Sequence, residues 1–135
     1  MVKDMTEQEI PANMPINLMI CLKIANNDKS IVKKLLAMFI SELPTAKTSI
    51  NEAFEKYDTN AMGALTHKLL GSSAYCGAQQ LQRSLNNISK HIKENNKEAI
   101  SNELGNMNNC ITEIMDYYRE NIINTNELEA TCSST

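Results

Sequence analysis

The fold of this chain is decided by residues 60–76, which read NAMGALTHKLLGSSAYC. At about 100° per residue this stretch predicts one helix. His67 lies roughly 200° around the axis from Leu65, so its side chain is expected to point to solvent. The stripe expected to face the core consists of Met62, Leu65, Leu69, Ser72 and Cys76.

The face that carries His67 has almost no side chains of its own. A helix face in contact with solvent normally carries Lys, Glu and Gln. Each glycine inside a helix also costs about 0.5–1 kcal/mol relative to alanine. This face therefore predicts that another molecule comes close to the imidazole ring. The residues expected to receive that molecule are Gly63, Ala64, Leu70, Gly71 and Ala74.

The chemistry available on this face is that of a lone imidazole. An exposed histidine is largely neutral and nucleophilic at neutral pH, and it can accept and return a phosphoryl group. Lys68 follows His67 about 100° further around the helix, where its ammonium could offset the charge of such a group. No carboxylate accompanies them. This pattern suits phosphoryl transfer in which the partner supplies the metal.

Composition narrows the class of protein. The chain has 135 residues, 42% of them hydrophobic and only 4% aromatic, which suits one helical domain. The net charge of −3 argues against nucleic-acid binding and against direct membrane contact, and no apolar run is long enough to span a bilayer. We expect no metal site in this chain and read its cysteines as reduced thiols. They are Cys21, Cys76, Cys110 and Cys132.

Apolar periodicity predicts helices along most of the chain. The expected helices cover residues 16–25, a long stretch that starts after Asp28 and ends near Tyr57, residues 60–76, a stretch from Leu81 to Ile92, and one from Ile100 to Tyr118. Pro44 predicts a kink or a break in the long helix. The apolar stripe of the long helix is read as Ile31, Leu35, Met38, Leu43, Ala46, Ile50, Phe54 and Tyr57.

These elements predict an all-α fold. Four amphipathic helices joined by short connections favour an antiparallel four-helix bundle, here with a short extra helix at the N-terminal side. We expect residues 1–14 to be a flexible leader, residues 15–123 to form the bundle domain, and residues 124–135 to be a disordered tail.

The motif around His67 resembles a known signature. Residues 66–73, THKLLGSS, followed by AYCGA at residues 74–78, resemble histidine-containing phosphotransfer (HPt) domains, with a His, a Gly four residues later, two small residues and then Gly-Ala. The opening from Pro15 to Ala25 and the long helix with Leu43-Pro44 extend the resemblance. It covers roughly residues 16–122 and is closest to the C-terminal HPt domain of BarA/GacS-type hybrid sensor histidine kinases.

The resemblance implies a function in bacterial two-component signalling. His67 would accept a phosphoryl group from the phosphoaspartate of one receiver domain and pass it to the Asp of a response regulator. Gly71 would be left bare for the docking receiver, and Mg²⁺ would be held by that receiver. Lys68 would stabilise the phosphate, because Leu70 stands where many family members carry Lys. The chain would be a cytoplasmic, monomeric phosphoryl carrier without an ATP site, and would form the tail of a larger kinase.

Two other readings compete with this one. The chain could be an interaction module that docks a partner through the His67 face without chemistry, in which case His67→Gln would cost no function. It could also be a hydrolase or metal enzyme, but no face gathers the carboxylate, His or Cys side chains that such a site needs. The second histidine, His91, lies between Lys90 and Ile92 and is read as a solvated residue.

Overall fold

The structure, a computed structural model, describes residues 14–123. Within that range the chain is all-helical and folds as a four-helix bundle with one short extra helix before it, as the sequence predicts. The leader expected at residues 1–14 lies outside the described range except for Met14, and the tail expected at 124–135 lies wholly outside it. The elements are α1 (Leu18–Ile24), α2 (Lys29–Glu55), α3 (Thr59–Tyr75), α4 (Gln79–Lys93), α5 (Lys97–Tyr117) and a π-helical turn, η1 (Tyr118–Ile123).

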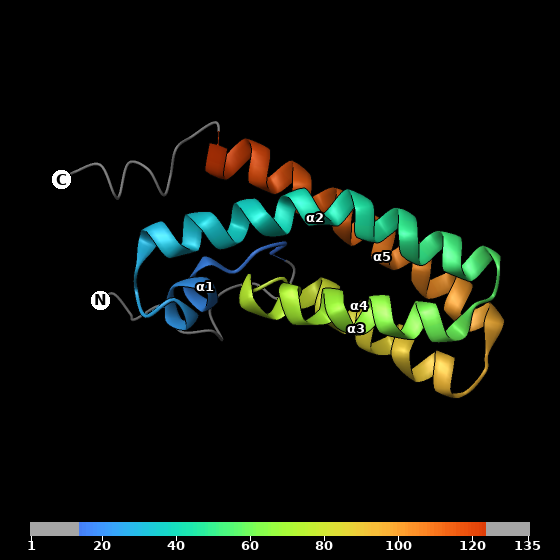
Figure 1. The fold of residues 1–135 in the computed structure, drawn as a ribbon. Helices are drawn as coiled ribbons and strands as arrows, with labels where there is room; N and C mark the ends of the chain where they lie inside the picture. The colour runs from blue at the N-terminus through green and yellow to red at the C-terminus, as the bar shows by residue number, and fades with distance from the viewer. Residues whose placement is uncertain (1–13, 124–135) are drawn as a thin grey trace.

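Short polar side chains begin four of the five helices. Asn17 accepts hydrogen bonds from the backbone N–H groups of Met19 and Ile20 and so caps α1. Asp28, Asp58 and Asn96 cap α2, α3 and α5 in the same way. Each cap satisfies backbone donors that have no partner within the helix. Because the connections between helices are so short, consecutive helices run antiparallel (Figure 1).

The two ends of the bundle are closed by different contacts. At one end, the hydroxyl of Tyr57 donates to Oδ1 of Asn95 at 2.7 Å and the ammonium of Lys97 lies 5.1 Å from the Tyr57 ring centroid. These contacts join the α2–α3 and α4–α5 turns, which lie together in Figure 1. At the other end, the backbone N–H of Asn17 donates to the carbonyl of Gly77 at 2.9 Å. This bond holds the start of α1 against the α3–α4 turn.

The long helix α2 differs from its sequence prediction in its buried stripe. It runs through Pro44 as one helix, so the break that was one of the two expected outcomes is absent, although Pro44 has no N–H to donate to the carbonyl of Ile40. Its buried stripe over the first half is displaced by one residue from the predicted one. Ile31 and Met38 are exposed, at 42% and 65%. The buried positions are instead Val32, Leu36, Phe39, Leu43, Ile50 and Ala53.

The core stripes of α4 and α5 follow the predicted period. In α4, Leu81, Leu85 and Ile88 are fully buried and Ile92 is half-buried. In α5 the buried residues are Ile100, Leu104, Met107, Ile111 and Ile114. None of the described helices combines the length and the apolar character that crossing a membrane would need.

Candidate functional site

His67 lies near the middle of α3, with its side chain exposed. The neighbours one turn before and after it on the same face are Ala64 and Gly71, and both are exposed as well. Gly63, Leu70 and Ala74 are half-buried along the flank of the same face. The structure thus brings together around one imidazole all five residues that the sequence predicts as a docking face. We call these residues, with His67, the His67 face.

The buried side of α3 is rotated slightly from the prediction. Leu65 and Ser72 are only half-buried, whereas Thr66 and Ser73 are fully buried together with Met62. This moves the centre of the stripe by about 40° around the helix axis. The hydroxyl of Ser73 donates to the carbonyl of Leu70 at 2.8 Å, while Oγ1 of Thr66 is buried without a partner. Thr66 and Ser73 therefore occupy the core positions predicted for Leu65 and Ser72, and His67 remains on the outward side.

The glycines of the His67 face are not required by packing within the chain. A Cβ atom built on Gly63 or on Gly71 would have no heavy atom within 4 Å, apart from its chain neighbours and its own helix. Gly77, at the end of α3, is different, because it has a φ of +64° and its Cβ would lie 2.4 Å from the carbonyl oxygen of Asn17. The fold explains Gly77 but leaves Gly63 and Gly71 without a structural reason.

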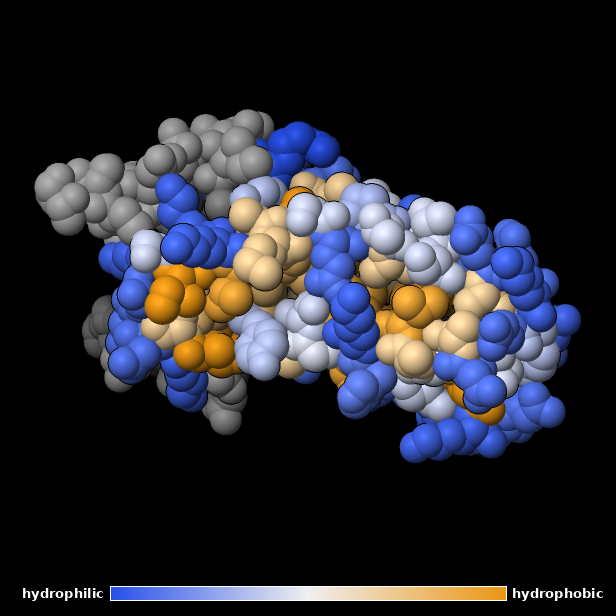
Figure 2. Space-filling model, in the orientation of Figure 1, coloured by the Kyte–Doolittle hydropathy of each residue, from blue (hydrophilic) through white to orange (hydrophobic). Residues whose placement is uncertain are grey.

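An exposed apolar stripe lies on the first half of α2, at the level of the C-terminal end of α3. The Cys76 thiol donates to the carbonyl of Leu35 at 3.7 Å, which places this part of α2 against the end of α3. Ile31 and Met38 lie one turn before and after Leu35 on α2 and are exposed. Tyr75 on α3 is 55% exposed. Figure 2 shows that apolar surface gathers at this end of the molecule, around α1 and the start of α2. This stripe was not predicted from the sequence, because Ile31 and Met38 were expected to lie in the core.

The charged and nucleophilic groups near His67 are few. Lys68 is exposed and makes no hydrogen bond or ion pair with a described residue, so its ammonium can move. Burial raises the pKa of the Cys21 thiol and of the Cys76 thiol to about 12, so neither is a nucleophile at neutral pH. Within residues 14–123, no group of three His, Cys, Asp or Glu side chains could hold a metal ion. His91 is half-buried on α4, with Nδ1 3.3 Å from Oε1 of Glu94.

A family model described as the Hpt domain matches residues 34–119, most of the bundle and all of the His67 face. The chain belongs to the Hpt domain family. Family membership assigns this Hpt domain to phosphotransfer in two-component signalling, where such domains interact with receiver domains.

Two solved structures are similar to this Hpt domain. One is the HPT domain of a sensor hybrid histidine kinase from Shewanella, with 25% identity and a TM-score of 0.74 over 82% of this chain and 96% of that one. The other is a histidine-containing phosphotransfer protein, ZmHP2, from maize, with 15% identity and a TM-score of 0.72 over 92% and 91% of the two chains. At that identity the maize protein supports the fold alone. A search of curated proteins found no match.

Proposed function

We propose that this Hpt domain relays phosphoryl groups between two receiver domains through His67. In the first step Nε2 of His67 attacks the phosphorus of a receiver phosphoaspartate. The P–N bond forms while the P–O bond to aspartate breaks, and the aspartate leaves as a carboxylate. In the second step the carboxylate of a response regulator attacks the phosphohistidine and releases His67. Nε2 is the ring nitrogen that projects farther from the backbone.

One observation carries this proposal: an outward imidazole on a face whose two glycines have no packing role. Glycine inside a helix is unfavourable, so a use outside the chain accounts for it best. A receiver must bring its aspartate to within bonding distance of the ring, and side chains at positions 63 and 71 would stand in its way. Ile31 and Met38 on α2 add exposed apolar area at the level of the C-terminal end of α3, which a partner can bury.

We also propose how the phosphoryl charge is neutralised and to which kind of protein the domain belongs. Lys68 neutralises part of the phosphoryl charge, and the receiver provides Mg²⁺. The sequence resemblance favours a BarA/GacS-type hybrid sensor kinase in the bacterial cytoplasm as the parent protein. The domain itself acts as a monomer, since the relay needs only one His67 face.

The test is to mix the chain with a receiver domain carrying ³²P-phosphoaspartate. We expect label on the chain that is labile to acid and stable to alkali. His67→Gln should abolish it, with a free energy of unfolding within about 0.5 kcal/mol of the original, because His67 is exposed and caps no helix. His91→Gln is the matched control and should keep the label. Label on the His67→Gln variant would overturn the proposal, and a pure docking module would bind the receiver without ever becoming labelled.

A further inference from the structure

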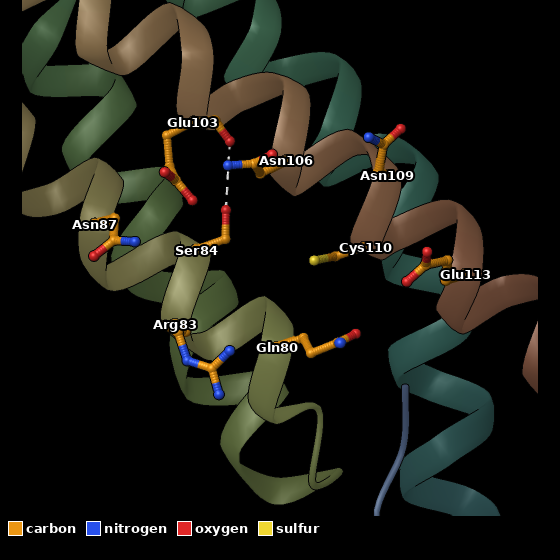
Figure 3. A pocket seen from close by; sticks show the side chains of 9 residues that line it. All are labelled: Gln80, Arg83, Ser84, Asn87, Glu103, Asn106, Asn109, Cys110 and Glu113. Carbon is orange, nitrogen blue, oxygen red and sulfur yellow. Dashed lines mark hydrogen bonds between the residues drawn. The ribbon is translucent and has the colours of Figure 1, made fainter. Parts of the chain in front are cut away.

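A groove runs between α4 and α5, on a face to which α3 contributes no lining residue. It is open to solvent and has a volume of about 340 Å³. A second hollow of about 370 Å³ continues it along α5, and the two share Gln80 and Glu113. In Figure 3, α4 contributes one wall and α5 the other, with Cys110 and Ser84 between them. The groove is lined by Gln80, Arg83, Ser84, Asn87, Glu103, Asn106, Asn109, Cys110 and Glu113.

The walls of this groove carry carboxamide groups that the chain itself does not use. The side chains of Gln80, Asn87, Asn106 and Asn109 make no hydrogen bond to any described residue. A carboxamide presents a donor and an acceptor together, which matches the C=O and N–H of a peptide group. From Glu103 in α5 to Glu120 in η1 the chain rises by about 26 Å along the helix axis, which corresponds to seven or eight residues of extended chain.

The charges along the groove are mostly negative. Glu103 and Glu113 line the first hollow, and Asp116 and Glu120 line the second. Arg119 pairs with Asp116 at 2.6 Å. Among the described residues, this leaves Glu103, Glu113 and Glu120 without an ion pair. One guanidinium, that of Arg83, lines the groove with them. A basic segment would therefore be attracted along the whole length of the groove.

We propose that the groove between α4 and α5 binds an extended basic peptide segment of a partner protein. Its backbone bonds to the carboxamides of Asn87, Asn106 and Asn109, and its Lys or Arg side chains pair with Glu103, Glu113 and Glu120. This site does not rest on the phosphorelay proposed above. Because α3 does not line the groove, the peptide and a receiver can be bound at the same time.

The test uses the full chain and fluorescein-labelled nonapeptides of alanine and glycine that carry two lysines at different separations. At about 50 mM salt we expect fluorescence polarisation to show at least one peptide binding with a Kd of about 100 μM or below, and the matching peptides with glutamate in place of lysine to bind at least about tenfold more weakly. Glu113→Gln, which removes one negative charge, should weaken peptide binding. Glu113→Lys, which reverses that charge, should weaken it further, by about tenfold. Glu55→Lys, an equal charge change at an exposed position on α2, should change it less than about twofold.

A second pair of variants separates carboxamide recognition from charge. The double variant Asn106→Ala, Asn109→Ala should weaken peptide binding several-fold, whereas Asn102→Ala, on the same helix but outside the groove, should not. All variants should keep the circular dichroism and the His67 labelling of the original chain. The proposal is overturned if no lysine nonapeptide binds below about 1 mM, if the glutamate peptides bind as well, if Glu55→Lys acts like Glu113→Lys, or if a bound peptide blocks transfer from the receiver.

Discussion

At the scale of single residues, Gly71 is the position that best separates the requirements of folding from those of the proposed phosphotransfer. It lies one turn after His67, it is exposed, and a Cβ there would meet nothing within 4 Å. A glycine kept for close helix packing would instead have atoms next to the built Cβ, as Gly77 has. The structure thus removes packing within the chain as an explanation for Gly71.

Replacing Gly71 should therefore move stability and activity in opposite directions. Gly71→Gln is expected to raise the free energy of unfolding by about 0.5 kcal/mol, because glutamine is the better helix former. It should also slow phosphotransfer at least about tenfold, because its side chain stands in the path of the receiver. Urea denaturation and single-turnover transfer from a phospho-receiver measure the two effects.

Gly105 offers a matched control for this experiment. It lies inside α5, is exposed, and likewise has no atom within 4 Å of its built Cβ. Gly105→Gln should give a similar gain in stability with unchanged transfer. If Gly71→Gln transferred at the original rate, the His67 face would not be held bare for a partner.

Lys68 gives a test of charge at the same scale. Lys68→Ala should slow phosphotransfer or shorten the lifetime of phosphohistidine by about two- to fivefold at low salt, with little change in receiver binding, because the ammonium is exposed and screened. The effect should fade as salt is raised. Equal rates for both proteins at low salt would make Lys68 an ordinary surface residue.

At the scale of elements, the contact between α1 and the α3–α4 turn depends on Gly77. Its φ of +64° is unfavourable for residues with a side chain, and a Cβ would lie 2.4 Å from the Asn17 carbonyl oxygen. That oxygen also accepts the N–H of Ile20, so it cannot retreat without disturbing the first turn of α1. Asn17 and Gly77 together fix where α1 sits.

Gly77→Ala should consequently be strongly destabilising. We expect it to lower the free energy of unfolding by about 2 kcal/mol or more, since both a left-handed conformation and a backbone clash must be relieved. Hydrogen exchange should be accelerated first in α1. A loss below about 0.5 kcal/mol would mean that the turn relaxes and that α1 is not held there.

The helices also show which parts of the fold were predictable from sequence. In α4 each core position has polar neighbours, and in α5 the large aliphatic residues recur at regular steps of four and three, so one stripe fits the helical period best, and it was predicted. The first half of α2 carries adjacent apolar pairs, Ile31-Val32, Leu35-Leu36 and Met38-Phe39, so two stripes fit equally well. Only packing against the other helices decides that the second residue of each pair is buried. The exposure of Ile31 and Met38 could therefore not be predicted from the sequence.

At the scale of the whole molecule, the bundle buries two thiols in one connected core. Cys21 on α1 and Cys76 at the end of α3 are 1% and 2% exposed, and burial raises the pKa of each to about 12. In an unfolded chain the thiols would ionise near their reference value of 9.0. The neutral thiols therefore favour the folded state fully below about pH 9, and this contribution is lost as the pH rises toward 12.

Alkaline unfolding should report these thiols. Under reducing conditions, each should add a slope of about −1.4 kcal/mol per pH unit to the free energy of unfolding above pH 9. Between about pH 9 and pH 10.5, the free energy of unfolding of the Cys76→Ala variant should fall with pH less steeply than that of the original chain, by most of one thiol's slope. This difference should appear even if the variant is less stable at pH 7. Urea titrations across this pH range measure the free energy of unfolding. If it fell equally steeply with pH in both proteins, the raised pKa of the Cys76 thiol would be contradicted.

The two surfaces differ in how far the sequence could predict them. All residues of the His67 face lie on one helix, so the period of that helix alone brought them together. The groove between α4 and α5 combines residues from two helices, and its position depends on how the antiparallel pair is registered around the Glu94–Asn96 turn. No local pattern predicts that register, and the groove became visible only in the folded chain.

The open space above Gly63 and Gly71 has a consequence for how such a domain changes over generations. Ala64 and Gly71, the exposed neighbours of His67, do not touch the core, so substitutions there leave the chain folded while the choice of partner changes. A library randomised at Ala64 and Gly71 should accordingly yield mostly folded variants with divergent receiver preferences. A screen for unfolded variants in that library would detect almost none, although the receivers served by the domain had changed.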